Sequence, residues 1–211
     1  MLAQLRSQPV IRFHDASHGL PGWPGDAAAA ANLLPARDPV FEWLLANHRW
    51  NCSLWAEEDL ARRTRVADSD IAENKRNIDR FNQARNDAIE RIDDELVRWQ
   101  QQFPRAAHAR LSSETPGAMI DRMSILSLKI HHMGLQTQRS DVDDAHRERC
   151  RERLGQLQAQ RDDLAACYDR LLDEIAAGVG YFKVYRQYKM YNDASLNPVL
   201  VAEQQAQSAA R

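Results

Sequence analysis

The chain has 211 residues, of which 44% are apolar and 27% are charged, and its acidic and basic residues leave a net charge of −2. This length suits one domain, or one domain with tails, and the apolar fraction is enough for a hydrophobic core. A surface that binds duplex nucleic acid usually needs a basic excess, so the near-neutral balance makes nucleic acid an unlikely partner.

The sequence also bears on the compartment. No run of about 18 apolar residues occurs, so we expect no membrane span. The segment MLAQLRSQPVIRFHD lacks the uninterrupted apolar stretch of a signal peptide. Cys150 and Cys167 lie on one predicted helix, roughly 25 Å apart, which is too far for a disulfide. We interpret these two residues and Cys52 as reduced thiols and expect a cytoplasmic protein.

In chain order, residues 1–37 are interpreted as an irregular N-terminal arm. The segment HGLPGWPGDAAAAANLLPARDP carries several turn-forming residues and a short alanine run. His14, Asp15 and His18 in this arm could bind a metal, but a flexible arm is the preferred interpretation.

Two long helices follow, joined by a short link. The first is expected to start with Asp38 as its cap and Pro39 in its first turn, and to run to about residue 63. The segment VADSD then breaks the pattern and supplies caps for the second helix, roughly 69–100. Because the link is short, the two helices should pack as an antiparallel hairpin.

Two further helices are predicted in the second half of the chain. The first begins at Thr115 and Pro116, and its apolar residues cover most of its circumference, so it should be the most buried helix. The second starts at the acidic segment RSDVDD and runs to about Ala177, some 50 Å. The segment YFKVYRQYKMYND, residues 181–193, is interpreted as a short C-terminal helix.

No segment alternates strictly between apolar and polar residues. We therefore predict an all-α fold, an antiparallel bundle of four long helices plus a short C-terminal helix, with an irregular N-terminal arm. The expected boundaries are 1–37 for the arm, 38–198 for a single helical domain and 199–211 for a polar C-terminal tail.

The apolar stripe of the second helix contains three polar residues. Its inward positions are Ile71, Lys75, Ile78, Asn82, Arg85, Ile89, Ile92 and Leu96. The first helix has a matching stripe within about 80° of arc: Leu44, Asn47, Asn51, Trp55, Glu58 and Arg62. Folding the hairpin about residues 66–67 would place Glu58 opposite Lys75, and would place Asn51 opposite Asn82.

This polar layer has two interpretations, which the sequence leaves open. A buried lysine or arginine without a partner is very costly, so the groups could simply satisfy one another and fix the helix register. Alternatively, they could line a pocket for a small anionic ligand that carries a sugar or a phosphate. Positive charge would come from Lys75, Arg85 and Arg62; Asn51, Asn82 and Glu58 would orient the ligand, and Trp55 would stack on it.

Four segments resemble a known family: NHRWNCSLWAEEDLAR, IDRFNQARNDAIERID, SETPGAMIDRMSILSLKIHHM and YFKVYRQYKMYND. Together they are similar to an uncharacterised bacterial family, domain of unknown function 4254, over roughly residues 40–198. The resemblance implies a bacterial protein with no assigned activity, so no catalytic residues can be carried over. Genes of this family are associated with glycosyltransferases and envelope polysaccharides, which suggests an accessory role in that synthesis.

Other polar residues could extend the site. Asp121 and Lys129 on the third predicted helix either join the polar layer or belong to an ordinary solvent-exposed strip. Arg186 and Lys189 in YFKVYRQYKMYND could hold a phosphate or a carboxylate. The plain alternative for this segment is a docking helix with a solvated basic face.

Two other functions remain possible. The first is a Mg²⁺-dependent hydrolase using Glu58, Asp59 and Asp79, similar to the all-α nucleotide pyrophosphohydrolases, although the third acid of their Glu-Glu-x-x-Glu pattern is missing. The second is an interaction scaffold that forms a homodimer through its long helices. We expect no cofactor other than this alternative Mg²⁺. Zinc is not expected from the adjacent His131 and His132, which point about 100° apart on a helix.

Overall fold

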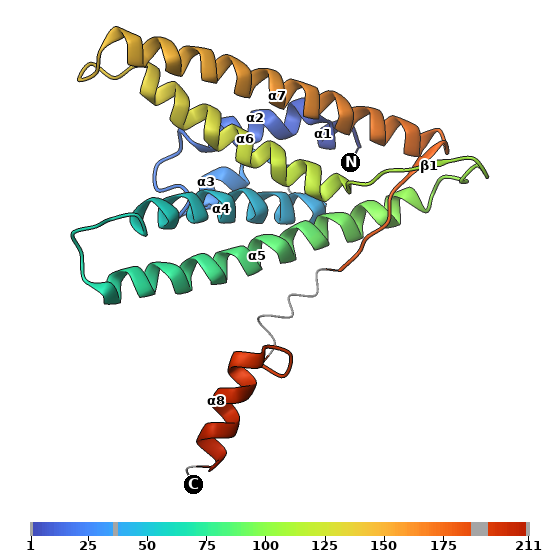
Figure 1. The fold of residues 1–211 in the computed structure, drawn as a ribbon. Coiled ribbons are helices and arrows are strands. Elements are labelled where there is room, and N and C mark those ends of the chain that lie inside the picture. Colours follow the sequence, from blue (N-terminus) through green and yellow to red (C-terminus); the bar gives the residue numbers. More distant parts are fainter. Residues whose placement is uncertain (1, 36–37, 187–193, 210–211) are drawn as a thin grey trace.

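The computed structural model describes residues 2–35, 38–186 and 194–209, and the prediction of an all-α fold is confirmed (Figure 1). The helices are α1 (Leu2–Leu5), α2 (Ser7–Ser17), α3 (Ala28–Ala31), α4 (Pro39–Leu60), α5 (Asp68–Gln100), α6 (Pro116–Thr137), α7 (Asp144–Ala176) and α8 (Pro198–Ala209). Among the described residues the only strands are β1 (Arg110–Leu111) and β2 (Gly180–Tyr181), which pair in parallel.

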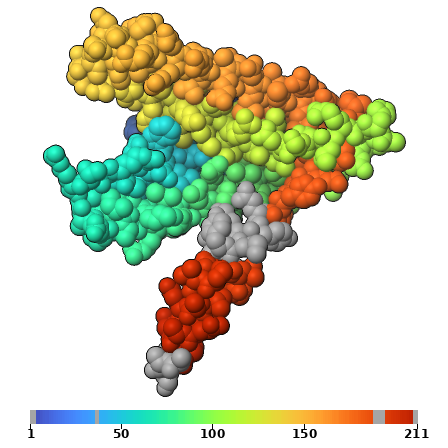
Figure 2. All heavy atoms as spheres, viewed as in Figure 1, coloured from blue at the N-terminus to red at the C-terminus, as the bar shows by residue number. Residues whose placement is uncertain are grey.

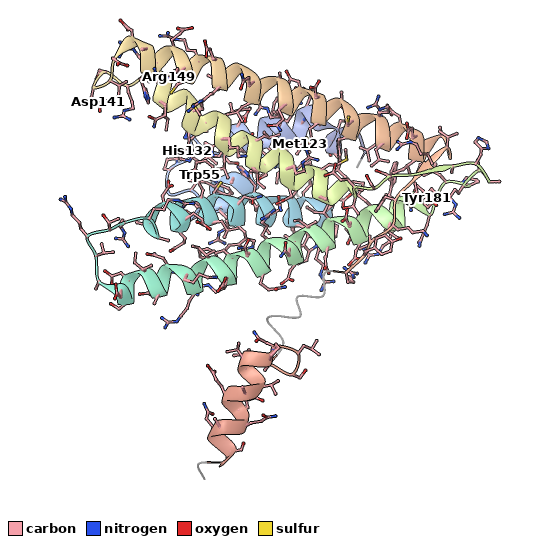
Figure 3. All side chains as sticks on the ribbon, viewed as in Figure 1. Trp55, Met123, His132, Asp141, Arg149 and Tyr181 are labelled. Atoms are coloured by element: carbon pink, nitrogen blue, oxygen red, sulfur yellow. The ribbon has the colours of Figure 1, made fainter. Side chains whose placement is uncertain are left out.

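The four long helices form two hairpins, α4 with α5 and α6 with α7 (Figure 1). Helix α6 packs on both α4 and α5, while α2 packs against α6 and α7. The hairpins diverge toward the loops at residues 61–67 and 138–143, and Figure 2 shows the surface hollowed between them at that end. Trp55 and His132 lie between the diverging hairpins (Figure 3).

Local sequence explains where three of these helices begin. The side chains of Asp38, Thr115 and Asp143 accept hydrogen bonds from the first-turn backbone N–H groups of α4, α6 and α7, at 3.2, 3.2 and 2.6 Å. These caps satisfy N–H groups that have no partner within the helix, and a proline follows two of them. The predicted bounds of all four long helices are therefore correct to within a few residues.

The N-terminal arm is not irregular, which corrects the prediction for residues 1–37. Helix α2 buries Val10, Ile11 and Phe13 in the main core, and the Phe13 side chain is 3% exposed. Polar contacts also attach this segment to α7. Asp169 accepts hydrogen bonds from the backbone N–H and the hydroxyl of Ser7, at 2.9 and 2.7 Å. The turn-forming residues that suggested an irregular arm lie only in the loop after α2.

The prediction of a C-terminal helix at 181–193 is also wrong for residues 181–186, which the structure describes. Residues 180–181 form β2, and no helix follows through residue 186; residues 187–193 lie outside the described residues. The side chain of Gln100 holds Phe182 in this extended path, because it accepts from the Phe182 N–H at 2.9 Å and donates to its carbonyl at 3.3 Å. Helix α8 instead covers most of the predicted polar tail at 199–211.

Glycine is required where the chain turns from α7 into β2. Gly178 has a φ of +73°, and a Cβ there would overlap the carbonyl oxygen of Pro104. Its own carbonyl accepts from the Ala106 N–H at 2.9 Å, which ties the loop between the hairpins to the end of α7. None of the described helices combines the length and the apolar character that crossing a membrane requires.

We predict that Phe13→Ala lowers the free energy of unfolding by about 3–5 kcal/mol, because it leaves a cavity in the core under α2. Urea denaturation followed by circular dichroism measures this change. Arg12→Ala, at an exposed position of the same helix, should cost far less and is the matched control. Equal effects of the two substitutions would mean that the N-terminal helix is only loosely attached.

A second prediction concerns Asp93, a buried carboxyl on α5 that accepts the Gly117 N–H at 2.7 Å. Burial raises the pKa of Asp93 to about 6. Its protonated form therefore stabilises the fold below pH 4, and this contribution is lost as the pH rises through 6. Asp93→Asn cannot ionise and still offers an acceptor oxygen to Gly117. The stability of the variant relative to the parent should rise by about 3 kcal/mol between pH 4 and 7, at 1.36 kcal/mol per pKa unit. A difference that is constant across this range would contradict the buried, protonated carboxyl.

Candidate functional site

The centre of the polar layer is the carboxylate of Asp121 on α6, whose side chain is 4% exposed. Arg85 from α5 donates to it twice, from Nε at 2.8 Å and from Nη2 at 2.5 Å. Asn47 and Asn51 from α4 each donate an amide N–H at 2.9 Å. One buried charge thus joins three helices, and we call these four residues the Asp121 hub.

The hub confirms that polar groups of the first hairpin meet in the core, but their pairing differs from the prediction. Asp121 raises the pKa of Arg85 by hydrogen bonding and keeps its guanidinium charged. That charge is already neutralised within the protein. Arg85 is therefore not a free cation for a ligand, although a quarter of its side chain is exposed.

The predicted pair of Glu58 and Lys75 is wrong. Lys75 is exposed and pairs with Asp79 one turn along α5, and Glu58 accepts a hydrogen bond at 3.0 Å from Arg62, just beyond the end of α4. Near the start of α5, Asn74 is buried in place of Lys75. Further along the helix, the predicted inward residues Ile78, Ile92 and Leu96 are buried as expected. Burying an amide costs less than burying an ammonium group. Asn74 finds its partner in Glu57, to which it donates at 2.7 Å.

A chain of hydrogen bonds leads from the hub toward α2. The same Asn51 amide group donates to Ser124 Oγ at 3.0 Å, and Ser124 lies 2.8 Å from His48 Nδ1. On its other side, His48 Nε2 is 3.1 Å from the carbonyl oxygen of His14. A carbonyl can only accept, so Nε2 carries the proton, and Nδ1 accepts the hydroxyl proton of Ser124. Burial lowers the pKa of His48, so the ring is neutral.

Two clefts lie beside this network, and Trp55 and Asp59 border both. The smaller cleft, about 340 Å³, adjoins the hub. Six of the predicted ligand residues line it: Asn51, Trp55, Glu58, Arg62, Asn82 and Arg85. Its two arginines are already paired, with Glu58 and Asp121, so the smaller cleft offers little free positive charge.

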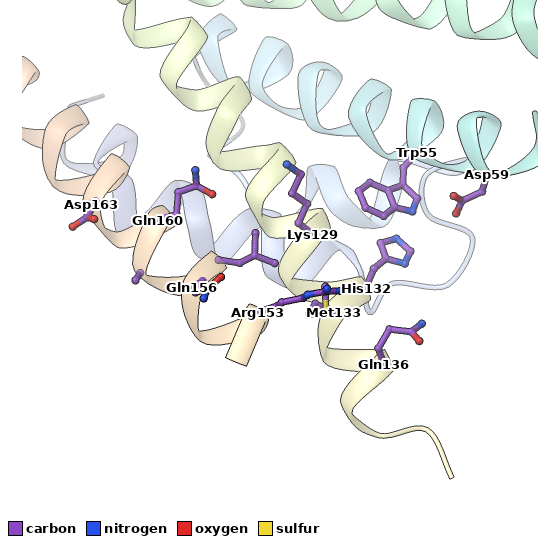
Figure 4. Close-up of a pocket in the computed structure, with 12 residues that line it drawn as sticks. Trp55, Asp59, Lys129, His132, Met133, Gln136, Arg153, Gln156, Gln160 and Asp163 are labelled. Atoms are coloured by element: carbon purple, nitrogen blue, oxygen red, sulfur yellow. The ribbon is translucent and has the colours of Figure 1, made fainter. Parts of the chain in front are cut away.

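The larger cleft, about 980 Å³, lies between the diverging ends of the two hairpins (Figure 4). Its lining includes Trp55 and Asp59 from α4, Lys129, His132 and Gln136 from α6, and Arg153, Gln156, Gln160 and Asp163 from α7. The Trp55 and His132 rings are stacked, with centroids 4.5 Å apart and planes at 6°. Burial lowers the pKa of His132, which favours the neutral imidazole in this stack.

Free cations distinguish the larger cleft from the smaller one. The side chains of Lys129 and Arg153 make no hydrogen bond or ion pair with any residue that the structure describes. In Figure 4 both side chains lie between the Trp55–His132 stack and the polar residues of α7. Lys129 therefore belongs to this cleft, two helical turns beyond Asp121, and not to the buried polar layer.

Five of the seven histidines form a continuous series of ring contacts from the core to the larger cleft. Centroid distances are 4.5 Å for His14–His48, 5.1 Å for His48–His18, 4.6 Å for His18–His131 and 5.3 Å for His131–His132. Burial, His18 and Arg161 lower the pKa of His14 to about 3. Both His14 ring nitrogens are buried without a hydrogen-bond partner among the described residues.

One group of side chains in this region has the composition of a metal site. The ligand atoms of His18, His48 and Cys52 lie within 4.8 Å of one another. The signal that would find this group in the sequence is a spacing of four residues, His14 to His18 and His48 to Cys52, because such pairs share one face of a helix.

The remaining predicted residues lie elsewhere. Arg186 pairs with Glu90 and Asp94 on the outside of α5, at 2.7 and 2.8 Å, so it does not reach either cleft. Lys189 lies outside the described residues. Among the described residues, the carboxylates of Glu58, Asp59 and Asp79 do not lie within 4.8 Å of one another as a group of three, and the alternative Mg²⁺ site stays a prediction. Glu58 and Asp79 are instead each paired along their own helices.

Comparison with known families gives one finding. A family model described as a protein of unknown function (DUF4254) matches residues 41–184, well over half of the chain, and confirms the resemblance seen in the sequence. Comparisons with curated proteins and with solved structures give no match. The matched residues include the Asp121 hub and both clefts, whereas α2 and His18 precede them.

We predict that Arg85→Leu lowers the free energy of unfolding by about 3 kcal/mol, because it leaves the Asp121 carboxylate buried without a cation. Chemical denaturation measures this loss. Lys75→Leu, which breaks an exposed pair on the same helix, should cost less than about 0.5 kcal/mol and serves as control. An Arg85→Leu variant as stable as the control would show that the hub does not depend on this ion pair.

Proposed function

The chain belongs to the DUF4254 family of proteins of unknown function, and we propose that it binds a small anion carrying a sugar or a phosphate in the larger cleft. This cleft, rather than the polar core of the first hairpin, offers cations that make no ion pair within the described residues, and the carboxylates of Asp59 and Asp163 also line it. The observation that carries the proposal is the presence of two unpaired cations, Lys129 and Arg153, in the same cleft as the stacked Trp55 and His132.

The shape of the cleft supports a ligand of this kind. We regard the two hairpins as an antiparallel four-helix bundle that is closed around Asp121 and open at the loop ends. Ligand sites typically occupy about 300–1,000 Å³, and the larger cleft, at about 980 Å³, is at the upper end of this range. An extended ligand with two or more chemical parts suits this volume better than a single phosphate ion.

The lining suggests how such a ligand would lie. Trp55 offers an aromatic surface on which a sugar or a base can stack. Lys129 and Arg153 would bind a phosphate or carboxylate through charge-assisted hydrogen bonds. Gln156 and Gln160 on α7 supply both donors and acceptors, which hydroxyl groups of a sugar require. The smaller cleft, which shares Trp55 and Asp59 with the larger one, adds the amide group of Asn82.

The proposal also includes the cellular compartment and the process in which the protein acts, and the process is suggested by the family resemblance. All three cysteines are free thiols, which agrees with work in the cytoplasm. We propose an accessory role in envelope polysaccharide synthesis, in which the protein would bind a charged sugar precursor. The Mg²⁺-dependent hydrolase with Glu58, Asp59 and Asp79 stays a prediction, which ligand binding measured with and without Mg²⁺ tests.

A helical interaction scaffold is the second candidate. Leu60 and Leu135 are 40% and 48% exposed, and they lie near the loop ends of the two hairpins. An apolar segment of a partner could cover them together with the cleft. The homodimer through the long helices stays a prediction.

The test is thermal unfolding of the full chain with a panel of nucleotides, nucleotide sugars and sugar phosphates, each with and without Mg²⁺. A ligand at 100 times its dissociation constant should stabilise the fold by about 2.7 kcal/mol. Lys129→Gln and Arg153→Gln should each weaken binding about 10- to 100-fold, because each removes one charged hydrogen bond. Trp55→Ala should weaken it further by removing the stacking surface.

Arg149→Gln is the matched control, since Arg149 is an exposed arginine on α7 that does not line the cleft. Its variant should bind like the parent chain. Binding that survives both cleft substitutions would place the ligand elsewhere, and no shift with any compound would favour the scaffold.

A further inference from the structure

The group formed by His18, His48 and Cys52 lies outside the proposed anion site and has its own chemistry. His48 and Cys52 occupy successive turns of α4, and His18 follows the last residue of α2. Their ligand atoms lie within 4.8 Å of one another. The three side chains therefore converge from two helices that are distant in sequence.

The distances between these ligand atoms are close to the distances between ligand atoms around a bound transition metal. In a tetrahedral zinc site with Zn–N near 2.0–2.1 Å and Zn–S near 2.3 Å, neighbouring nitrogen and sulfur ligands lie roughly 3.6 Å apart. The observed distance from His48 Nε2 to Cys52 Sγ is 3.8 Å. The ligand atom of His18 lies within 4.8 Å of the other two, so completing such a triangle requires its side chain to move by roughly 1.5 Å at most, on the same geometry.

A second observation points to a missing ligand. His18 Nε2 is buried without any hydrogen-bond partner among the described residues. A buried polar atom left without a hydrogen bond destabilises the fold, so native structures rarely retain one without a reason. Coordination of an ion would give this nitrogen a partner without moving the helices.

We propose that His18, His48 and Cys52 bind one Zn²⁺ ion, which fastens the end of α2 to α4. Two imidazoles and a thiolate are ligands that zinc accepts readily, whereas Mg²⁺ and Ca²⁺ require oxygen ligands. Three protein ligands leave one position of a tetrahedral ion for water or another small ligand.

The surrounding contacts match those expected around metal ligands. Ser124 Oγ lies 2.8 Å from His48 Nδ1, and Trp23 Nε1–H donates to Cys52 Sγ at 3.2 Å. Hydrogen bonds of this kind orient a ligating histidine and stabilise the charge on a ligating sulfur. Two of the three ligands are thus already held by an outer partner.

Binding requires a defined movement of protons. His48 Nε2 must give up its proton to coordinate the ion, so the ring takes the other tautomer, and Nδ1–H then donates to Ser124 Oγ. Cys52 loses its thiol proton as the Zn–S bond forms. His18 is neutral before and after binding. The balance is one proton released to solvent for each ion bound. Cys52 is a buried thiol, and metal coordination is what favours its ionised form.

The experiment uses the full chain after treatment with a chelator. Zn²⁺ is titrated against a competing chelating dye, Co²⁺ is used as a spectroscopic probe, and calorimetry in two buffers of different ionisation enthalpy counts protons. We expect one equivalent of metal, a near-ultraviolet thiolate-to-cobalt charge-transfer band, one proton released near pH 7 and a higher melting temperature with Zn²⁺.

Variants identify the ligands. Cys52→Ser should abolish the charge-transfer band, and Cys52→Ser and His18→Gln should each weaken Zn²⁺ binding at least about 100-fold, beyond the range for outer contacts. Ser124→Ala should weaken binding about 10- to 100-fold and keep the band. If Cys52→Ser fails to fold by circular dichroism, His18→Gln at a partly exposed position carries the test.

Cys150→Ser is the matched control. Cys150 lies 3.4 Å from His146 Nε2 with the same spacing of four residues, but no third ligand of the described chain joins this pair. Its variant should bind Zn²⁺ like the parent. The proposal is overturned if the parent binds no metal, if both His18→Gln and Cys52→Ser retain it, or if Cys150→Ser loses it.

Discussion

The buried carboxylate of Asp121 is the constraint on which the arrangement of the long helices depends. A charge with so little exposure must find a cation and further donors inside the protein, because its hydration is lost. Arg85 supplies the cation, and Asn47 and Asn51 supply the remaining donors. Since these groups come from α5 and α4, one side chain of α6 sets the position of both helices of the first hairpin. The same pairing removes Arg85 from the set of residues free to bind a ligand.

The open end of the molecule follows from where this constraint acts. Beyond Asp121 toward the loops, the two hairpins diverge (Figure 1). The next side chains of α4 and α6, Trp55 and Lys129 among them, therefore border a cleft rather than a closed core. The buried residues around Asp121 and the residues that border the cleft thus lie on the same two helices, α4 and α6. For this reason the polar stripes in the sequence are compatible with both a structural role and ligand binding.

Local chemistry made much of the fold predictable, and long-range packing explains most of what was not. Capping residues such as Asp38 and Thr115 act within one turn, so helix starts can be read directly. Whether Asn74 or Lys75 is buried depends on the relative cost of burying an amide and an ammonium group, which the apolar periodicity of the sequence does not express. Helix α2 could not be predicted from its local sequence, because its stability comes from packing on α6 and α7. For the site, Trp55 and Lys129 were identifiable by residue type, whereas Arg153 emerges only once α7 is placed.

Ser124 connects the two polar centres of the protein. Its hydroxyl oxygen accepts from Asn51, whose other amide hydrogen binds Asp121, and its proton goes to His48. A hydroxyl has a single proton, so its role toward His48 must reverse from donor to acceptor if that ring changes tautomer. Any event at His48 that requires a free Nε2 therefore alters a group bonded directly to the Asp121 hub. When His48 carries its proton on Nε2, both of its ring nitrogens have hydrogen-bond partners. When the proton is on Nδ1, Ser124 must accept from His48 instead of donating to it. A change at His48, near α2, therefore affects a residue that is bonded directly to the Asp121 hub.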